Sequence, residues 1–507
     1  MRVLFIYPNL YAQIGFNYGI AFLSAILKKK GHTTSLLNIN EKMGYPLDLD
    51  RIRKDIEKYN PGIVGISAVT NQFQYALEIA QMIKRYFTIP IVCGGIHATI
   101  TPEEVLNSGY FDYLCVGEGE HALLELVEKL EKGEDTSSIA NIWLRQNGKI
   151  IKNKVRSFVD LNSLPAKDYT IFNFQQMIDA KNGWVGIMSS RGCPFKCSYC
   201  FNHQMVNIYK TDLKVPMKKL QYIRHHHAER MIEELSTLLN DYKNIRIFIL
   251  DDDLFTLNKE YLSAFCKEYK KHINKPFVVN GHIKFFDDER AHILKEARCE
   301  IVKFGLESGS ERIRKEVLYR PMKDREIIKA FEIAHKHDLH TSAFVIFGLP
   351  YETREDLLMT IKLLAHIKPG RFRWSIFFPY INTAAYEISK EGGFIDFEKM
   401  RSLSNFTEES CLNFGKRHNL WIKKLQKVLP WYVNAYTDYA CSSLYRPLIQ
   451  EVEHMSATIW EEAKTKILSL DEHISQLLIL NQKEHYAIKY NEFMAVHSNW
   501  FRKKEWS

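Results

Sequence analysis

Three of the nine cysteines lie close together in one short stretch, RGCPFKCSYCFN, residues 191–202. Cys193, Cys197 and Cys200 form the pattern C-x-x-x-C-x-x-C. Three thiolates on one loop can bind three corners of a [4Fe–4S] cluster and leave the fourth iron without a protein ligand. Zinc is the main alternative, but a closed structural zinc site needs four ligands, and the nearest supplement is His203. A group of packed core cysteines is the third interpretation, and the pattern favours the iron–sulfur cluster over both.

Polar residues and glycines also follow predicted strands farther along the chain. Glu307 lies in GLESGS, residues 305–310, where its carboxylate could accept hydrogen bonds from a ribose or an amino group. Gly305 leaves room for a ligand against the backbone. The alternative for Glu307 is a negative charge at a helix N-terminus, where it complements the helix dipole. The aspartates at 251–253 could be a metal site or a helix cap, and we interpret them as a cap with Asp252 facing a cofactor.

Glycines follow two predicted strands of the N-terminal region. Gly94 and Gly95 follow one strand, and Gly117 and Gly119 follow the next. Ligands of parallel sheets bind at the carboxyl ends of the strands, so these glycines indicate a ligand-binding edge. A tight turn from strand to helix would use the same glycines, and this alternative stays open.

The elements that must position these residues follow from the hydrophobic pattern. From residue 3 to about residue 131, short β-branched runs alternate with amphipathic stretches of helical length. Five strands with helical crossovers predict a parallel, doubly wound sheet. The predicted strands are VLFIY, TSLLNI, GIVGIS, IPIVCGG and YLCVGEG, and the predicted helices between them are GIAFLSAILKKKG, the segment around RIRKDIEKY, QYALEIAQMIKRYF and PEEVLNSG.

A hairpin, a barrel and a helical region are predicted after this sheet. IWLRQNGKIIKN indicates a hairpin with Asn147-Gly148 at its turn, and a linker with a proline follows it. Six further strands, WVGIMSS, IRIFIL, FVVNG, IVKFGLE, TSAFVIFG and FRWSIFF, alternate with helical stretches and predict a partial (β/α)6 barrel. The predicted α/β organisation is a Rossmann-like domain at 1–135, hairpin and linker at 136–180, the barrel at 181–384 and a mainly helical domain at 385–507.

Composition and charge exclude several classes of protein. The hydrophobic fraction of 46% and the charged fraction of 25% are those of an ordinary globular protein. The net charge of +9 is spread over segments of mixed sign, so we expect no nucleic-acid partner and a mild preference for acidic partners. The uncharged stretch from Val3 to Leu27 is interrupted by Pro8 and polar residues, which predicts no transmembrane segment and no signal peptide. We therefore expect a cytoplasmic protein, and in a reducing cytosol clustered cysteines are more often metal ligands than disulfides.

The cysteine pattern, with Tyr199 directly before the last cysteine, resembles the signature of the radical S-adenosylmethionine (SAM) superfamily. The strand ends at Asp252-Phe255, Gly305-Ser310 and Phe347-Pro350 resemble motifs of that family in the same order. The resemblance implies that the open iron chelates SAM and that the reduced cluster cleaves it to a 5′-deoxyadenosyl radical. It also implies cluster ligation by Cys193, Cys197 and Cys200 and SAM contacts at Tyr199, Asp252, Gly305, Glu307, Ser308, Gly348 and Pro350.

The N-terminal region resembles the cobalamin-binding domain that precedes this core in one large radical SAM subclass. The matching segments are GIAFL at 19–23, GGIHAT at 94–99 and GEGE at 117–120. The motif Asp-x-His-x-x-Gly, by which many cobalamin proteins ligate cobalt, is absent from this region. Three alternatives stay open: no side chain ligates the lower face of cobalt, another residue does, or the domain has lost cobalamin. The contacts that the resemblance implies are Gly94, Gly95, Thr99, Gly117, Glu118, Gly119 and His97, with His97 expected in a loop beside the nucleotide tail rather than on cobalt.

The combined resemblance implies a cobalamin-dependent radical SAM methyltransferase that acts on an unactivated carbon. One SAM would methylate cobalamin, and a second would supply the radical that abstracts a substrate hydrogen. Cyclisation or rearrangement without net methylation is the first alternative, and a non-enzymatic cobalamin or redox sensor is the second. Methylthio transfer would need three cysteines in the first domain, which offers only Cys93 and Cys115. The expected partners are a small-molecule, lipid or peptide substrate and an electron donor of the flavodoxin or ferredoxin type.

Overall fold

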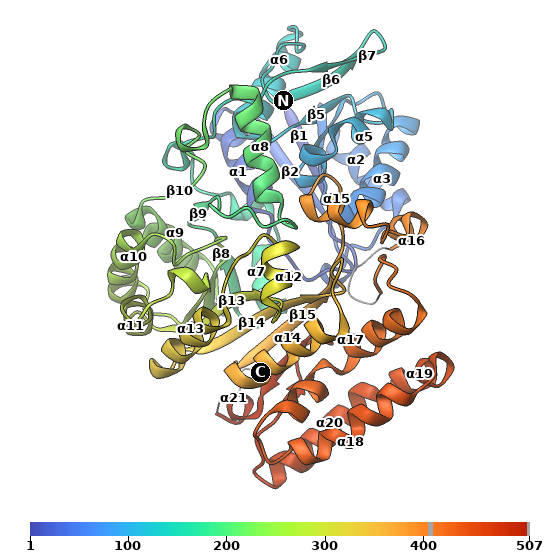
Figure 1. The fold of residues 1–507 in the computed structure, drawn as a ribbon. Coiled ribbons are helices and arrows are strands. Elements are labelled where there is room, and N and C mark those ends of the chain that lie inside the picture. Colours follow the sequence, from blue (N-terminus) through green and yellow to red (C-terminus); the bar gives the residue numbers. More distant parts are fainter. Residues whose placement is uncertain (404–408, 504–507) are drawn as a thin grey trace. The chain divides into compact units, whose positions relative to one another are not determined.

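The computed structural model describes residues 1–403 and 409–503 (Figure 1). The chain forms two compact units. The first unit comprises Met1–Pro194 and Cys200–Phe248, and the second comprises Phe195–Tyr199 and Ile249–Ser507. The chain therefore passes between the units within the cysteine loop and again within strand β11 (Ile247–Leu250). The predicted domain boundaries stay a prediction. Within the described ranges, no helix is long and apolar enough to cross a membrane.

All five predicted strands of the N-terminal region form, and they make a parallel sheet in the order β2-β1-β3-β4-β5. The predicted hairpin also forms: β6 pairs antiparallel with both β5 and β7, and Asn147 and Gly148 turn it with φ of 49° and 76°. Asn and Gly favour such left-handed turns because their side chains hinder this backbone least. The strands of the first unit are β1 (Arg2–Pro8), β2 (Thr33–Ile39), β3 (Ile63–Ser67), β4 (Ile91–Gly94), β5 (Tyr113–Cys115), β6 (Ile142–Gln146), β7 (Lys149–Lys152), β8 (Trp184–Ile187), β9 (Ser190–Arg191) and β10 (Arg224–His225).

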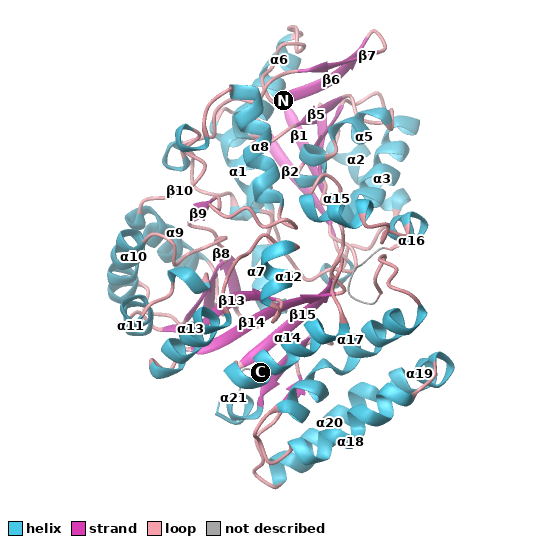
Figure 2. Cartoon of the chain, in the orientation of Figure 1, coloured by secondary structure: helices cyan, strands magenta, loops and turns pink. Residues whose placement is uncertain are grey.

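Helices cover both faces of this sheet, which confirms the doubly wound fold (Figure 2). The larger core gathers Ile52 of α2 and Ile79 of α3 against Val64 of β3. A smaller core packs Phe22 of α1 against Leu161 of the linker. The helices of the first unit are α1 (Tyr18–Lys29), α2 (Leu49–Tyr59), α3 (Phe73–Tyr86), α4 (Ile96–Ile100), α5 (Pro102–Asn107), α6 (Glu120–Lys132), α7 (Phe174–Ala180), α8 (Phe201–Leu213) and α9 (Ala228–Asp241), with short 3-10 turns at Glu41–Met43, Thr70–Gln72, Leu161–Ser163, Tyr169–Ile171 and Met217–Lys219.

The second unit is built on a second parallel sheet. All six predicted barrel strands form, as β8, β11, β12, β13, β14 and β15. Within the second unit, β12, β13, β14 and β15 pair in parallel and in chain order. The strands of this unit are β12 (Phe277–Gly281), β13 (Cys299–Glu307), β14 (His340–Phe347), β15 (Arg371–Ile376), β16 (Tyr486–Ile488) and β17 (Met494–His497).

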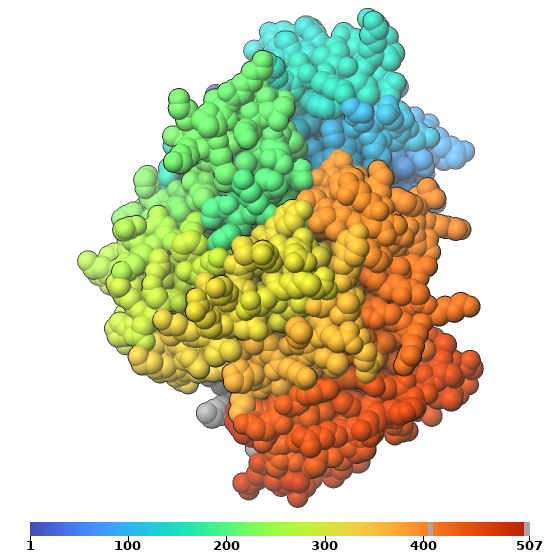
Figure 3. Space-filling view, viewed as in Figure 1, coloured from blue at the N-terminus to red at the C-terminus, as the bar shows by residue number. Residues whose placement is uncertain are grey.

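The C-terminal region is mainly helical, as predicted, but it also adds two strands that the sequence did not reveal. β17 pairs antiparallel with β15, and β16 pairs with β17. Figure 3 shows the atoms of the C-terminal region in orange and red. The helices of the second unit are α10 (Lys259–His272), α11 (Asp288–Glu296), α12 (Glu311–Glu316), α13 (Asp324–Lys336), α14 (Arg354–Ile367), α15 (Ala384–Glu391), α16 (Phe397–Ser402), α17 (Lys416–Tyr436), α18 (Ser442–His454), α19 (Ala457–Ala463), α20 (Ile467–Leu480) and α21 (Ser498–Lys503), with 3-10 turns at Ile283–Phe285 and Lys464–Lys466.

Candidate active site

A pocket of about 260 Å³ opens at the carboxyl ends of the parallel strands in the first unit. Ser67 ends β3, Gly94 ends β4 and Cys115 ends β5, and all three line the pocket. The strand order 2-1-3-4-5 reverses direction between β1 and β3, and parallel sheets bind ligands at such a switch point. The lining residues are Phe5, Asn17, Tyr18, Gly19, Ile20, Leu23, Gly65, Ile66, Ser67, Val92, Gly94, Gly95, Cys115, Gly117, Glu118, Gly119, Glu120, Leu123, Met188 and Arg191.

The predicted glycines lie where a ligand-binding edge was expected. Gly94, Gly95, Gly117 and Gly119 all line the pocket. Gly117 has a φ of +82°, and a Cβ there would lie 2.4 Å from the hydroxyl oxygen of Tyr209. Position 117 therefore needs a glycine, both for its positive φ and for its close packing against Tyr209. The backbone itself forms this wall of the pocket.

His97 and Thr99 do not line the pocket. The prediction that His97 lies in a loop is wrong, because it is in α4 with its ring packed on Phe73, the two centroids 4.0 Å apart. Burial lowers the pKa of His97 to about 4, so the ring is neutral at physiological pH. Thr99 joins the two glycine segments instead: its hydroxyl accepts from Gly117 N at 3.0 Å and donates to Gly95 O at 3.0 Å.

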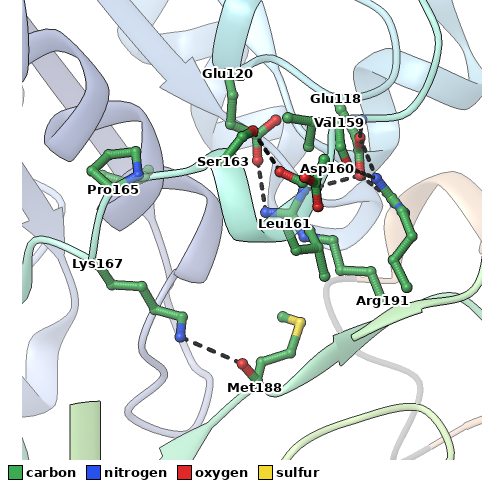
Figure 4. Close-up of polar contacts among 12 residues, drawn as sticks. Glu118, Glu120, Val159, Asp160, Leu161, Ser163, Pro165, Lys167, Met188 and Arg191 are labelled. Carbon is green, nitrogen blue, oxygen red and sulfur yellow. Dashed lines mark hydrogen bonds and ion pairs between the residues drawn. The ribbon is translucent and has the colours of Figure 1, made fainter. Parts of the chain in front are cut away.

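Glu118 was predicted to contact a cofactor, and in the structure both of its oxygens are bound by protein groups. Oε1 accepts from Arg191 Nη1 at 2.9 Å and from Arg224 Nη2 at 2.7 Å. Oε2 accepts from Arg224 Nη1 at 3.0 Å and from Val159 N at 2.9 Å. Burial alone would raise the pKa of this carboxyl, but the two arginines outweigh it and lower the pKa below the usual value. Figure 4 shows Glu118 with Arg191 and the linker residue Val159.

The flanks of the cysteine loop contact this same wall of the pocket. Arg191, two residues before Cys193, lines the pocket and binds Glu118 and Glu120. Helix α8 begins directly after Cys200, and its Tyr209 hydroxyl accepts from Glu118 N at 2.9 Å. Our sequence analysis missed Arg191, Arg224 and Tyr209 as contributors to the site. Their partners are far away in the sequence, and only Arg191, two residues before Cys193, offered a local signal.

The middle of the cysteine loop belongs to the second unit and is anchored there. Ser198 donates from N to Leu318 O at 3.0 Å and from its hydroxyl to Val317 O at 2.6 Å. Phe195 stacks on His282 with ring centroids 3.9 Å apart. These contacts hold the segment between the cysteines against the barrel strands' connecting loops, as a cofactor-binding loop requires.

Within the described part of the chain, none of the three predicted cluster ligands forms a disulfide bond. Cys197 is buried, whereas Cys193 and Cys200 are partly exposed. In the described part of the chain, no three His, Cys, Asp or Glu side chains converge on one point.

In the second unit, Arg320 links Cys197 to the strand end that carries Glu307. Arg320 donates from Nη1 to Cys197 Sγ at 3.5 Å and from Nη2 to Gly305 O at 2.9 Å. Burial raises the pKa of Glu307, and the charge of Arg320 and a hydrogen bond from Tyr199 oppose this rise. The structure thus brings Tyr199, Gly305 and Glu307 together with one of the three cysteines. Arg320 was not identified in the sequence analysis.

The strand end at Glu307 has an unusual backbone. Glu307 has a φ of 65°, and the pairing of β13 with β14 shifts register between Gly305 and Glu307. A Cβ on Gly305 would lie 2.3 Å from Glu307 Oε1. A left-handed glutamate next to a required glycine is costly, and such strain is found most often at binding sites.

The other predicted SAM contacts lie at strand ends of the same unit. Asp252 is buried, and its backbone oxygen accepts from Asn280 Nδ2 at 2.8 Å. Ser308 is buried, and its hydroxyl accepts from Ser310 N at 3.2 Å, so it shapes the turn after β13. Gly348 has a φ of 72°, which suits a residue without a side chain, and Pro350 is buried two residues later.

Glu352 supports the turn that holds Gly348. Its Oε2 accepts from Gly348 N at 2.7 Å and from Leu349 N at 3.2 Å. Its Oε1 is buried and has no hydrogen-bond partner among the described residues. Burial raises the pKa of this carboxyl to about 8. The neutral, protonated acid is therefore the form that the fold favours.

The burial of Glu352 predicts that the unfolding free energy depends on pH. A Glu352→Gln variant should lack this dependence. The folded-state pKa lies above the ordinary value of 4.5, so the neutral carboxyl stabilises the fold at low pH and this stabilisation is lost as the pH rises towards 8. Between about pH 6 and pH 8 the wild type should lose about 2 kcal/mol of unfolding free energy relative to the variant. Chemical denaturation at several pH values measures this difference. Glu355→Gln is the control, because Glu355 is exposed and lies three residues away, on α14. If the stability difference between wild type and Glu352→Gln did not change with pH, the assignment would be contradicted.

Comparison with known proteins gives two family models that match in succession. The B12 binding domain matches residues 10–127, and the Radical SAM superfamily matches residues 187–364. The first model covers β3, β4 and β5, whose ends line the pocket, and the second covers the cysteine loop, Glu307 and Gly348.

Named relatives span most of the chain. A protein called uncharacterized methyltransferase PH0819, from Pyrococcus horikoshii, is 29% identical over 76% of this chain and 83% of its own. The anaerobic magnesium-protoporphyrin IX monomethyl ester cyclase of Rubrivivax gelatinosus is 25% identical over 82% of this chain and 75% of its own. The solved structure of the cobalamin-dependent S-adenosylmethionine radical enzyme OxsB, with aqua-cobalamin and S-adenosylmethionine bound, has the same fold. Its TM-score is 0.66 at 15% identity, over 95% of this chain and 75% of that chain.

Proposed function

Because the chain belongs to the cobalamin-dependent radical SAM enzymes, we propose that it transfers a methyl group to an unactivated carbon of its substrate. When bound, the cluster and SAM supply a carbon radical, and cobalamin supplies the methyl group. The single observation that carries this proposal is the position of Arg191. This residue lines the pocket of the B12-binding region and precedes the first cysteine of the radical SAM motif by two positions.

The residues of the cysteine loop suit a cluster with one open iron. Cys193, Cys197 and Cys200 would hold it, since all three lie on one loop and none forms a disulfide bond within the described residues. Arg320 would donate a hydrogen bond to the Cys197 sulfur, which stabilises a thiolate. Glu307 and Tyr199 would orient SAM by hydrogen bonds to its amino group or ribose.

The pocket of the first unit could hold part of a cobalamin molecule. Its glycines and small side chains leave the backbone accessible, and its volume is slightly below that of ordinary small-molecule sites, which begin at about 300 Å³. Among the residues that the structure describes, no histidine lines this pocket. The pocket therefore does not favour histidine ligation of cobalt, in agreement with the absence of the Asp-x-His-x-x-Gly motif. Gly94, Gly95, Gly117 and Gly119 would contact the cofactor, and Glu118 would hold their loop in place through its arginine partners.

The reaction requires electrons at low potential. A flavodoxin or ferredoxin type of donor would supply them, and the acidic surface typical of such donors suits a chain with a net charge of +9. The substrate class that we propose is a small molecule, with a lipid or a peptide as alternatives.

Product analysis tests the proposal before any substrate is known. The protein would be reconstituted without oxygen with iron, sulfide and hydroxocobalamin, reduced, and given SAM. Mass spectrometry should detect both 5′-deoxyadenosine and S-adenosylhomocysteine. Methyl transfer would convert one SAM to S-adenosylhomocysteine and cleave a second to the 5′-deoxyadenosyl radical. Formation of 5′-deoxyadenosine alone would instead favour cyclisation or rearrangement, an alternative that the similarity to the Rubrivivax gelatinosus cyclase supports. Absence of both products would favour the non-enzymatic sensor.

A further inference from the structure

One carboxylate oxygen in the pocket of the first unit lacks a hydrogen-bond donor. Glu120 is the first residue of α6, is only 4% exposed and lines the pocket. Its Oε1 accepts from Arg191 Nη2 at 2.6 Å. Its Oε2 is buried and has no partner anywhere in the described part of the chain. A buried acceptor without a donor costs free energy, and native structures rarely leave one unless another molecule completes it.

Other polar side chains of this pocket already have their partners. Asn17 donates from Nδ2 to Ser67 Oγ at 3.2 Å and accepts from Ile20 N at 3.0 Å. Glu118 accepts four hydrogen bonds, as described above. Of the lining side chains within the described ranges, Glu120 alone has a buried nitrogen or oxygen without a hydrogen bond.

The position of Glu120 on the helix and its ion pair with Arg191 explain one carboxylate oxygen, but not why the other is buried. A negative charge at the first position of a helix complements the helix dipole, and Arg191 binds one oxygen. Either role would be met equally well by a carboxylate whose second oxygen faced solvent. Figure 4 shows Glu120 and Arg191 close to the linker that follows the hairpin. The second oxygen is instead buried, on a residue that lines the pocket.

We propose that Glu120 Oε2 accepts a hydrogen bond from an amide N–H or a hydroxyl group of the ligand in this pocket, and that Glu120 is therefore a cobalamin-binding residue. The inference rests on the proposed function. A carboxylate only accepts hydrogen bonds, so the group that it meets must be a donor, and a phosphate or carboxylate would be repelled from this position. Cobalamin offers both suitable donors, as primary amides on the corrin ring and as a ribose hydroxyl on the nucleotide tail.

A Glu120→Gln variant reverses the polarity of this position. Its carbonyl oxygen would turn to Arg191, which needs an acceptor, and its amide nitrogen would then present donors to the pocket. Donor would meet donor, so hydroxocobalamin should bind about 10-fold to 100-fold more weakly than to the wild type. Equilibrium dialysis with absorbance detection measures the dissociation constant on the full chain. Glu125→Gln is the matched control, because Glu125 lies on the same helix, binds Arg156 and does not line the pocket.

A second variant keeps the test decisive if the glutamine protein folds poorly. Glu120→Asp retains the negative charge for Arg191 but withdraws the second oxygen by one methylene, and it should weaken binding in the same direction by a smaller factor. The same titrations with cobinamide, which has the corrin amides but no nucleotide tail, identify the donor. A loss that persists with cobinamide indicates a corrin amide, and a loss confined to cobalamin indicates the tail.

The outcomes separate this inference from the proposed function. If the wild type fails to bind hydroxocobalamin, the proposed function is wrong. If the wild type binds it and both Glu120 variants bind it equally well, the proposed function stands and the assignment of Glu120 is overturned.

Discussion

A Cys197→Ala variant should form 5′-deoxyadenosine at least about 100-fold more slowly than the wild type, because loss of even a residue that only supports a metal ligand costs about 10-fold to 100-fold. Cys197 is buried and accepts a hydrogen bond from Arg320, so the variant also leaves that guanidinium without its sulfur partner. Mass spectrometry of the reduced, reconstituted protein with SAM measures the product.

The same variant should still bind hydroxocobalamin, since the pocket proposed for cobalamin lies in the first unit and does not include Cys197. Cys266→Ala is the control: Cys266 is equally buried, but it lies on α10 outside the cysteine loop. Retained 5′-deoxyadenosine formation in Cys197→Ala, or an equal loss in Cys266→Ala, would show that the cysteine pattern is not the cluster site.

A Glu118→Ala variant should lower the unfolding free energy by about 3 kcal/mol, because removal of one partner leaves buried charges without compensation. Glu118 binds Arg191 at 2.9 Å and Arg224 at 2.7 Å, and the three side chains are 16%, 18% and 10% exposed. Two guanidinium groups would lose their shared carboxylate in this variant. Denaturant unfolding of the protein without cofactors measures the loss of free energy.

Glu103→Ala is the matched control for this prediction. Glu103 forms an ion pair with Lys152 in the same unit, but the glutamate side chain is 61% exposed. Its removal should cost less than about 0.5 kcal/mol, as is usual for surface charges. Equal effects of the two substitutions would mean that the network around Glu118 contributes no more to stability than an ordinary surface pair.

Much of the fold could be predicted because the signals that determine it are local. The β-branched runs at β1, β3 and β4 alternate with amphipathic helices, and this alternation permits few folds other than a parallel, doubly wound sheet. Asn147-Gly148 specified the hairpin turn through its backbone preference alone. The cysteine spacing and the glycines after β4 and β5 could be placed at strand ends for the same reason.

The parts that escaped prediction depend on partners far away in the sequence. β16 and β17 are short, and they exist because β15 offers an edge on which to pair. Glu118 is separated from Arg191 by 73 positions and from Arg224 by 106, so no local pattern could show that its carboxylate is occupied by protein groups. His97 was expected in a loop, but Gly95, with its φ of 96°, ends the strand early and α4 begins at the next residue.

The structure also changes which acidic residue of the GEGE segment is expected to meet the cofactor. The resemblance to cobalamin-binding domains pointed to Glu118, whose two oxygens are bound by arginines and a backbone amide. Both glutamates line the pocket, but among the described residues only Glu120 has a buried oxygen without a hydrogen-bond partner. The distinction arises because Arg224 and the Val159 amide bind the second oxygen of Glu118, which the order of residues alone does not reveal.

Metal analysis of the protein purified and reconstituted without oxygen tests the central claim most directly. One chain should hold roughly four iron atoms, from a single [4Fe–4S] cluster, together with one cobalt from cobalamin, and no stoichiometric zinc. Stoichiometric zinc without iron would contradict the account, because it would assign the three cysteines to a structural zinc site and leave SAM with no iron to bind.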